Sequence, residues 1–273
     1  MKVSIITPSF NGARFLRDCL ESVRIQTGVE CEHIVQDAGS TDGSLEILAD
    51  YPEVLLYREP DLGMSDAINK GLKHATGDWW MWLNTDDLLL PDALATVSSF
   101  AAAHPEADVI YGDWLFVDAR RQHLKKCSPP AFNRFVMAHA GCYIASTATF
   151  FKKKTTFDAG ELLCVPFKQA MDQEYFVRLG QLKKKFLHVP SCLAEFRIHG
   201  NNTSTRYSGK QDVTTTLQRQ IQLAEGATVR RVYGFSLSRR RFEIANNLSD
   251  FVLYLLCFGW KVIRKLIEGC YWR

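Results

Sequence analysis

The stretch VSIITPSFNG, residues 3–12, decides the fold together with residues 13–26. Its first half is mostly β-branched and apolar and stops at Pro8, which predicts a strand followed by a loop. In residues 13–26 the apolar side chains recur with the spacing of one helix face; they are Phe15, Leu16, Leu20 and Val23. The chain therefore opens with a strand, a loop and a helix.

The same order repeats through residues 1–105. Further strands are predicted at residues 33–35, 54–57 and 79–83, and further helices around Leu48 and at residues 65–74 and 92–103. This alternation predicts an α/β fold with a mostly parallel central sheet flanked by helices. Because ligands bind beyond the carboxyl ends of parallel strands, we expect the loops at Ser9, Asp37 and Asp86 to form the ligand site.

The regular alternation ends after residue 103. Residues 107–151 predict short strands and turns, and the pattern then predicts a helix at residues 169–182 and strands at residues 186–189 and 193–198. We expect one domain over residues 1–205, divided near residue 105, and a helical C-terminal extension over residues 206–273.

Composition excludes several classes of protein. The chain has 273 residues, and its 33 basic residues exceed its 30 acidic ones by only three, so nothing in the overall charge indicates a nucleic-acid partner. Its eight cysteines form no Cys-x-x-Cys pair and no zinc-type spacing. The first residues lead directly into a strand without the features of a signal peptide. We therefore expect a reduced, cytoplasmic protein whose fold starts at its first strand.

The C-terminal extension contains one unusual run. Residues 251–260 are uncharged and are followed by Lys261, Arg264 and Lys265. This run is too short to span a bilayer, which needs about twenty apolar residues. It would suit a membrane interface, with the basic residues 239–241 adding attraction to anionic lipid at the cytoplasmic face. Packing on the domain or on a second subunit explains the same pattern, so both interpretations stay open.

Acidic residues follow two of the predicted strands. Asp37 begins the loop QDAGSTDGS, residues 36–44, where an aspartate can accept hydrogen bonds from a nucleobase or a ribose and Gly39 permits close approach of a ligand. The sequence NTDD, residues 84–87, follows the apolar strand at residues 79–83 and offers the oxygens that Mg²⁺ or Mn²⁺ prefer. Both loops equally suit the capping of the helices that follow them.

Two further candidates lie in the second half. Asp172 and Glu174 near the start of the helix at residues 169–182 cannot share one helix face, so at most one of them serves a site. Asp172 is a candidate general base, although an acid in the first turn also stabilises the helix dipole. His199 follows the last predicted strand, and a single histidine is more often structural than a ligand.

Taken in order, these segments resemble the family-2 glycosyltransferases, which are inverting enzymes with the GT-A nucleotide-binding fold. The resemblance covers about residues 2–204 and rests on SIITPSFN (4–11), QDAGSTDG (36–43), DAINKG (66–71), LNTDD (83–87) and residues 172–179. It implies transfer of a sugar from a nucleoside-diphosphate sugar to a hydroxyl acceptor, in the synthesis of cell-surface polysaccharide or glycolipid. Residues 1–105 would then bind the nucleotide-sugar donor, and residues 106–205 would bind a sugar or lipid-linked saccharide acceptor.

The resemblance also assigns roles to individual residues. The donor would contact Pro8, Ser9, Phe10, Asp37, Asp66, Lys70, Asn84 and Thr85, with Asp37 holding the base. A divalent cation, Mn²⁺ or Mg²⁺, would bind Asp86, with Asp87 and His199 as further candidate ligands. Asn84 replaces the first acid of the family's Asp-x-Asp motif, which leaves open whether Asp86 binds the metal alone. Asp172 would be the catalytic base, although Met171 stands where an acid often precedes it.

The implied reaction is a single in-line displacement in which Asp172 removes the proton of the acceptor hydroxyl.

Two other classes of function remain as alternatives. A nucleotidyltransferase usually has a glycine-rich phosphate loop near its first strand, where this chain has PSFN, residues 8–11. A nucleotide-sugar-binding or scaffold protein without turnover would have no need for Asp172.

Overall fold

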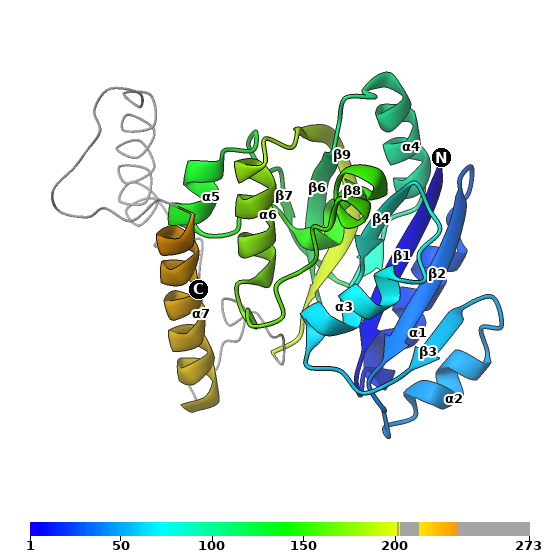
Figure 1. Cartoon of the computed structure of the whole chain (residues 1–273). Helices are drawn as coiled ribbons and strands as arrows, with labels where there is room; N and C mark the ends of the chain where they lie inside the picture. Colours follow the sequence, from blue (N-terminus) through cyan, green and yellow to red (C-terminus); the bar gives the residue numbers. More distant parts are fainter. Residues whose placement is uncertain (201, 203–212, 234–273) are drawn as a thin grey trace, which may run out of the picture.

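The computed structural model describes residues 1–200, 202 and 213–233, and the statements below concern these residues. The first half alternates strands and helices as predicted (Figure 1). Its elements are β1 (Lys2–Ser9), α1 (Ala13–Arg24), β2 (Glu30–Asp37), α2 (Ser44–Ala49), β3 (Leu55–Arg58), α3 (Met64–Leu72), β4 (Trp79–Trp82), β5 (Leu88–Leu89) and α4 (Ala93–Ala103). The two-residue strand β5 was not predicted, because two apolar residues carry no detectable period.

The second half departs further from the prediction. Its elements are β6 (Val109–Asp118), β7 (His123–Cys127), α5 (Arg134–Ala140), β8 (Thr149–Lys152), α6 (Met171–Gln181), β9 (Phe186–Ile198) and α7 (Val213–Val232), with short 3₁₀ turns at Ser146–Ala148, Lys153–Thr155 and Phe157–Ala159. The two strands predicted in residues 186–198 form the single strand β9, whose pairing with β6 shifts register between Gly112 and Trp114. This irregularity accommodates Pro190, which has no N–H for the ladder.

One mixed sheet joins the two halves. The strand order is β3-β2-β1-β4-β8-β6-β9-β5, with β7 paired to β6. Strands β1 to β4 are parallel, β8 is antiparallel to both β4 and β6, and β6 is parallel to β9. Two successive antiparallel pairings restore the direction of β4, so the carboxyl end of β9 lies at the same edge as those of β1, β2 and β4. This edge carries the candidate site.

Alternate residues of the central strands fill two hydrophobic layers. On one face, Ile5 of β1 and Met81 of β4 pack with side chains of α1 and α4. On the other face, Ile6 packs with Trp80, Trp82 and side chains of α3 and α6. The ring of Trp82 stacks on Phe151 of β8 at a centroid distance of 5.4 Å. These apolar layers hold the strands in register and leave the polar loops at the sheet edge.

Helix α7 belongs to the predicted C-terminal extension and packs against α5 and α6 (Figure 1). No helix in the described part of the chain is long and apolar enough to cross a membrane. The run at residues 251–260 and the basic residues 239–241, on which the membrane and the packing interpretations both rest, lie outside the described residues.

Candidate functional site

The loop after β2 is organised around the buried carboxylate of Asp37. One carboxylate oxygen accepts the backbone N–H groups of Gly39 and Ser40 at 2.9 and 2.8 Å. The other accepts the hydroxyl groups of Ser9 and Ser40 at 3.0 and 2.6 Å. Burial opposes ionisation of Asp37, but these four hydrogen bonds outweigh it and lower its pKa below the ordinary value. Asp37 is therefore ionised and joins the loops after β1 and β2.

Further contacts fix these two loops together. The backbone N–H of Asn11 donates to the Ser40 hydroxyl at 2.8 Å, and the side chain of Asn11 accepts the N–H of Thr41 at 2.9 Å. Phe10, in the same loop, is 65% exposed. A Cβ atom at Gly12 would lie 2.7 Å from the hydroxyl oxygen of Thr85, so glycine lets α1 start close to the loop after β4. The result is a pair of hydrogen-bonded loops that presents an exposed aromatic ring.

The predicted donor residues of α3 form a charged pair at its first turns. Asp66 accepts the backbone N–H of Leu62 at 3.0 Å and lies 3.4 Å from the ammonium group of Lys70. The same ammonium group donates to the carbonyl of Pro60 at 2.5 Å. Both side chains are partly exposed, at 19% and 21%. Asp66 and the Pro60 carbonyl therefore hold the ammonium group of Lys70 in place before a phosphate binds to it.

Asp86 and His199 meet across the sheet edge. Nε2 of His199 lies 2.9 Å from a carboxylate oxygen of Asp86, and Asn202 donates to the same oxygen at 3.3 Å. The His199 side chain is 9% exposed and that of Asp86 is 24% exposed. The structure thus brings together two residues predicted as metal ligands that are 113 positions apart in the sequence.

Asp87, in contrast, turns into the protein. Its oxygens accept the backbone N–H of Arg197 at 3.0 Å, the Thr147 hydroxyl at 2.7 Å and the Asn84 amide at 3.2 Å. Burial, together with the nearby charge of Asp86, raises the pKa of Asp87 to about 8. Asp87 is 1% exposed, and its hydrogen bonds fix β9 against the loop after β4.

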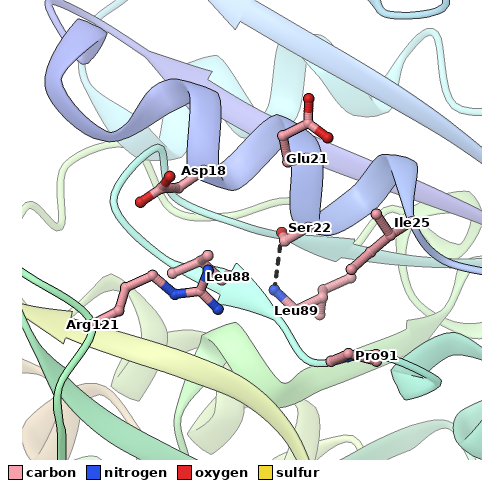
Figure 2. Close-up of a pocket in the computed structure, with 8 residues that line it drawn as sticks. All are labelled: Asp18, Glu21, Ser22, Ile25, Leu88, Leu89, Pro91 and Arg121. Atoms are coloured by element: carbon pink, nitrogen blue, oxygen red, sulfur yellow. Dashed lines mark hydrogen bonds between the residues drawn. The ribbon is translucent and has the colours of Figure 1, made fainter.

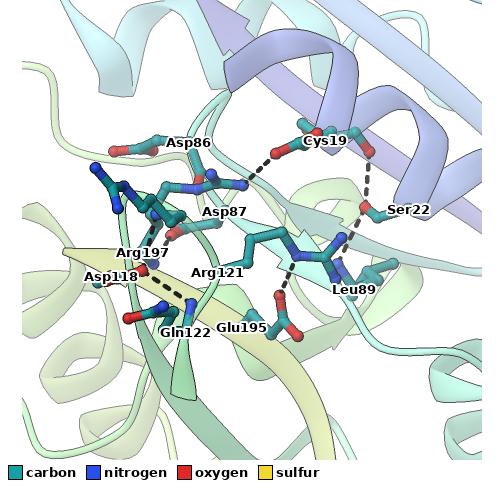
Figure 3. A network of polar contacts seen from close by, with 12 residues as sticks. Cys19, Ser22, Asp86, Asp87, Leu89, Asp118, Arg121, Gln122, Glu195 and Arg197 are labelled. Carbon is teal, nitrogen blue, oxygen red and sulfur yellow. Dashed lines mark hydrogen bonds and ion pairs between the residues drawn. The ribbon is translucent and has the colours of Figure 1, made fainter. Parts of the chain in front are cut away.

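Arg197 is a central residue of the site that sequence reasoning did not single out (Figure 3). Its guanidinium group pairs with Asp18 at 2.6 Å, donates to the carbonyl of Asp86 at 3.0 Å and lies over the ring of Phe15. The side chain is only 2% exposed. The available signal was an arginine between the apolar residues Phe196 and Ile198 near the end of a predicted strand, since a buried charge needs a partner.

Asp172 lies in the first turn of α6 and is partly exposed, whereas Glu174 is 1% exposed. Glu174 forms a buried ion pair with Arg178 at 2.7 Å and accepts a hydrogen bond from Tyr233. The hydroxyl of Ser65, in the first turn of α3, donates to the carbonyl of Phe167 at 3.4 Å, which brings the start of α6 close to the start of α3. Of the two acids, Asp172 is therefore the one that remains accessible to a ligand, and it lies in a helix whose start is close to that of α3.

A pocket of about 120 Å³ lies beside this network, between α1 and β5 with the residues that follow β5 (Figure 2). Its polar lining includes Asp18, Glu21, Ser22 and Arg121. None of the residues predicted to bind donor or metal lines it. The pocket shares Asp18, the partner of Arg197, with the network, and we place the candidate site at the strand ends and not in this pocket.

The donor set of the site fits a divalent cation that is shared with a ligand. The described residues contain no group of three or more His, Cys, Asp or Glu side chains that could enclose a metal. Mg²⁺ and Mn²⁺ are commonly held by one or two carboxylates together with substrate phosphates. Asp86 and His199 offer that incomplete set, and the buried Oδ1 of Asn84, two positions before Asp86, has no hydrogen-bond partner among the described residues.

Comparison with known proteins adds independent findings. The family model described as glycosyl transferase family 2 matches residues 4–178. A PGL/p-HBAD biosynthesis glycosyltransferase of Mycobacterium bovis is 39% identical over 116 residues, which cover 40% of this chain and 45% of that protein. The match therefore spans less than half the length of that relative.

Solved structures share the fold at low sequence identity. S. aureus TarS 1-349 in complex with UDP superposes with a TM-score of 0.62 at 19% identity, covering 95% of this chain and 79% of TarS. The mannosyltransferase PcManGT from Pyrobaculum calidifontis, in complex with GDP-Man and Mn²⁺, superposes with a TM-score of 0.55 at 16% identity, covering 95% and 80%. These likenesses confirm the predicted GT-A nucleotide-binding fold.

Proposed function

The chain belongs to glycosyl transferase family 2, and we propose that it transfers a sugar from a nucleoside-diphosphate sugar to a hydroxyl acceptor with inversion. The main support for this proposal is that the Asp37 loop and the Asp86–His199 pair follow strands that end at one sheet edge, while the segment before α6 contacts the start of α3. The relative named for PGL/p-HBAD biosynthesis supports a role in glycolipid or polysaccharide synthesis, with a saccharide or lipid-linked acceptor.

The donor nucleotide would bind over the loops after β1 and β2. Phe10 and Pro8 would flank the base, and the ribose and diphosphate would extend toward Asp66, Lys70 and Thr85. A carboxylate has about four acceptor positions, and Asp37 already uses four. A base N–H that binds Asp37 must therefore displace a hydroxyl group of Ser9 or Ser40, which gives Asp37 both a structural and a binding role.

Asp86 and His199 would hold a divalent cation, with Asn84 beside it, while Asp87 keeps its buried structural contacts. When bound, such a cation neutralises the charge that develops on the departing nucleoside diphosphate. Asp172 would accept the proton of the acceptor hydroxyl as that oxygen attacks the anomeric carbon. The configuration of the sugar inverts because the attack and the departure occur on opposite faces in a single step.

The test is a thermal-stability screen with nucleoside diphosphates and nucleotide sugars, each with and without Mn²⁺. We expect one nucleotide to raise the unfolding temperature more strongly with Mn²⁺ than without it, because a ligand that binds only the folded state stabilises it. Asp86→Ala should remove most of the Mn²⁺-dependent part. Asp158→Ala, which changes an exposed carboxylate that is not among the candidate site residues, is the matched control.

Equal nucleotide binding by the wild type and Asp86→Ala across a Mn²⁺ titration would reject the metal assignment. Stabilisation by a nucleotide sugar without any turnover, across a range of saccharide and lipid-linked acceptors, would instead favour a binding protein. Release of nucleoside diphosphate that depends on an acceptor would support the transferase directly.

A further inference from the structure

The start of α6 is held by a side chain from a distant helix. Glu225 of α7 accepts the backbone N–H of Lys168 at 2.9 Å and those of Gln169 and Ala170 at 2.8 Å each. Ala170 is the N-cap residue of α6 and has no side-chain acceptor of its own. The carboxylate of Glu225 therefore fixes the backbone that leads into α6, up to two residues before Asp172.

Residues on the other side of Asp172 are fixed as well. The amide of Gln173 donates to the carbonyls of Met137 and Ala138 at the end of α5, at 2.8 and 3.2 Å. Arg230 of α7 donates to the carbonyl of Ala138 at 3.3 Å. Gly226, the neighbour of Glu225, is buried, and a Cβ atom there would lie 3.5 Å from the amide oxygen of Gln173. These contacts thus hold helices α5, α6 and α7 together around the first turn of α6.

The same segment also contacts the donor half. The ammonium group of Lys168 donates to the carbonyl of Leu62, whose own N–H donates to Asp66 at 3.0 Å. Lys168 therefore links α3, which carries the predicted donor residues Asp66 and Lys70, to Glu225 on α7. The start of α3 and helix α7 are therefore joined through one residue, Lys168.

We infer that Glu225 is a positioning residue that holds Asp172 at the correct place relative to the donor, an inference that rests on the proposed role of Asp172 as the base. The carboxylate accepts three consecutive backbone N–H groups, and each of these N–H groups favours a negative charge at the start of α6. Helix α7 then contributes to the reaction by holding Asp172 in position. A side chain more than fifty positions after Asp172 would govern the rate of the chemical step.

Glu225→Gln in the full chain tests this inference. The substitution keeps the size of the side chain but removes its charge and one of its two acceptor oxygens. We expect kcat for sugar transfer to fall about 10- to 100-fold, as for small misplacements of a reacting group, while KM for the donor stays within about two-fold. Thr228→Ala on the same helix removes only a hydrogen bond within α7, to the carbonyl of Ala224, and should leave kcat unchanged.

A second readout does not depend on turnover. In Glu225→Gln the amides of Lys168, Gln169 and Ala170 should exchange with solvent faster than in the wild type, and those in the interior of β1 should not change. Should Glu225→Gln not fold, the wild type still decides, because fast exchange of these three amides in the intact protein would contradict the contact.

The double variant Glu225→Gln with Asp172→Asn separates positioning from other effects. A residue that acts through Asp172 adds no further loss once Asp172 is replaced, so the double variant should be as slow as Asp172→Asn alone. Two results would overturn this inference only. One is a loss of kcat in the double variant equal to the product of the losses in the two single variants. The other is an unchanged kcat in Glu225→Gln while Asp172→Asn is inactive. Full activity of Asp172→Asn would reject the proposed base and, with it, the role of Glu225.

Discussion

The donor half and the acceptor half place their carboxylates by different means. Asp37 is held by Gly39 and Ser40 in its own loop and by Ser9 of the neighbouring strand. The segment before Asp172 is held by Glu225, between 55 and 57 positions away along the chain. The donor site is therefore built from short motifs, whereas the acceptor site depends on the assembly of distant helices.

This difference predicts different responses to mutation. A change in a donor-half loop should act mainly on nucleotide binding, because neighbouring hydrogen bonds keep the rest of the loop in place. A change in the helices α5 to α7 should act on stability and on the rate of the chemical step together. Four predictions test this contrast, from the largest expected effect to the smallest.

Asp172→Asn should give the largest effect on transfer. The amide keeps the size of the carboxylate but cannot accept a proton, so the transfer rate should fall by roughly 10²- to 10⁴-fold, the usual contribution of a general base. Nucleotide affinity should stay within a few-fold, because the proposed donor contacts lie in the other half. Nucleotide binding and sugar transfer are to be measured on the same preparation, and transfer within a few-fold of wild type would show that another group is the base.

The same contrast explains what could be predicted from the sequence. Strand ends, loops and helices of the donor half follow from period and turn residues, and the motifs around Asp37 and Asp86 predicted a site at one edge. The pairing of Asp86 with His199 joins residues 113 positions apart, so only the resemblance to a family suggested it. The local sequence does not predict the contacts of Arg197 with Asp18 and of Glu225 with α6, because these contacts arise from packing of distant segments.

Arg178→Leu should cause the largest loss of stability in the acceptor half. It leaves Glu174, whose side chain is 2% exposed, without its ion-pair partner, and it also removes the contact with Glu161. Loss of one partner of a buried ion pair costs about 3–5 kcal/mol. Urea unfolding should show this loss, whereas Lys153→Met, which removes a more exposed pair with Asp158, should cost about 1 kcal/mol or less. Similar losses in both variants would contradict the contrast.

His33 should make the donor half sensitive to acid. Its Nε2 lies 2.8 Å from the Thr7 hydroxyl, and burial lowers its pKa from 6.5 to about 4. Between these values the unfolded chain binds a proton that the folded protein does not, so stability is lost as the pH falls from about 6.5 to about 4. The unfolding free energy lost over this pH range is about 3 kcal/mol, which follows from the difference between the two pKa values.

His33→Gln should flatten that part of the dependence of unfolding free energy on pH, measured by urea unfolding between pH 4 and pH 7. His104→Gln is the control, because the His104 side chain is 41% exposed and belongs to the end of α4. An unchanged slope in His33→Gln would show that other groups cause the acid sensitivity.

Phe10→Ala should give the smallest effect and the most selective one. The ring is 65% exposed and contributes little to the core, so the unfolding free energy should change by less than about 0.5 kcal/mol. Stacking of an aromatic side chain on a base contributes about 1–3 kcal/mol, so nucleotide affinity should fall by about 10-fold. Calorimetric titration with the nucleotide found in the stability screen measures this, and Leu124→Ala on β7, where the side chain is 55% exposed, is the matched control. Equal affinity in Phe10→Ala and wild type would remove the ring from the donor site, and a fall in stability without a fall in affinity would show that this loop needs its exposed side chain for folding.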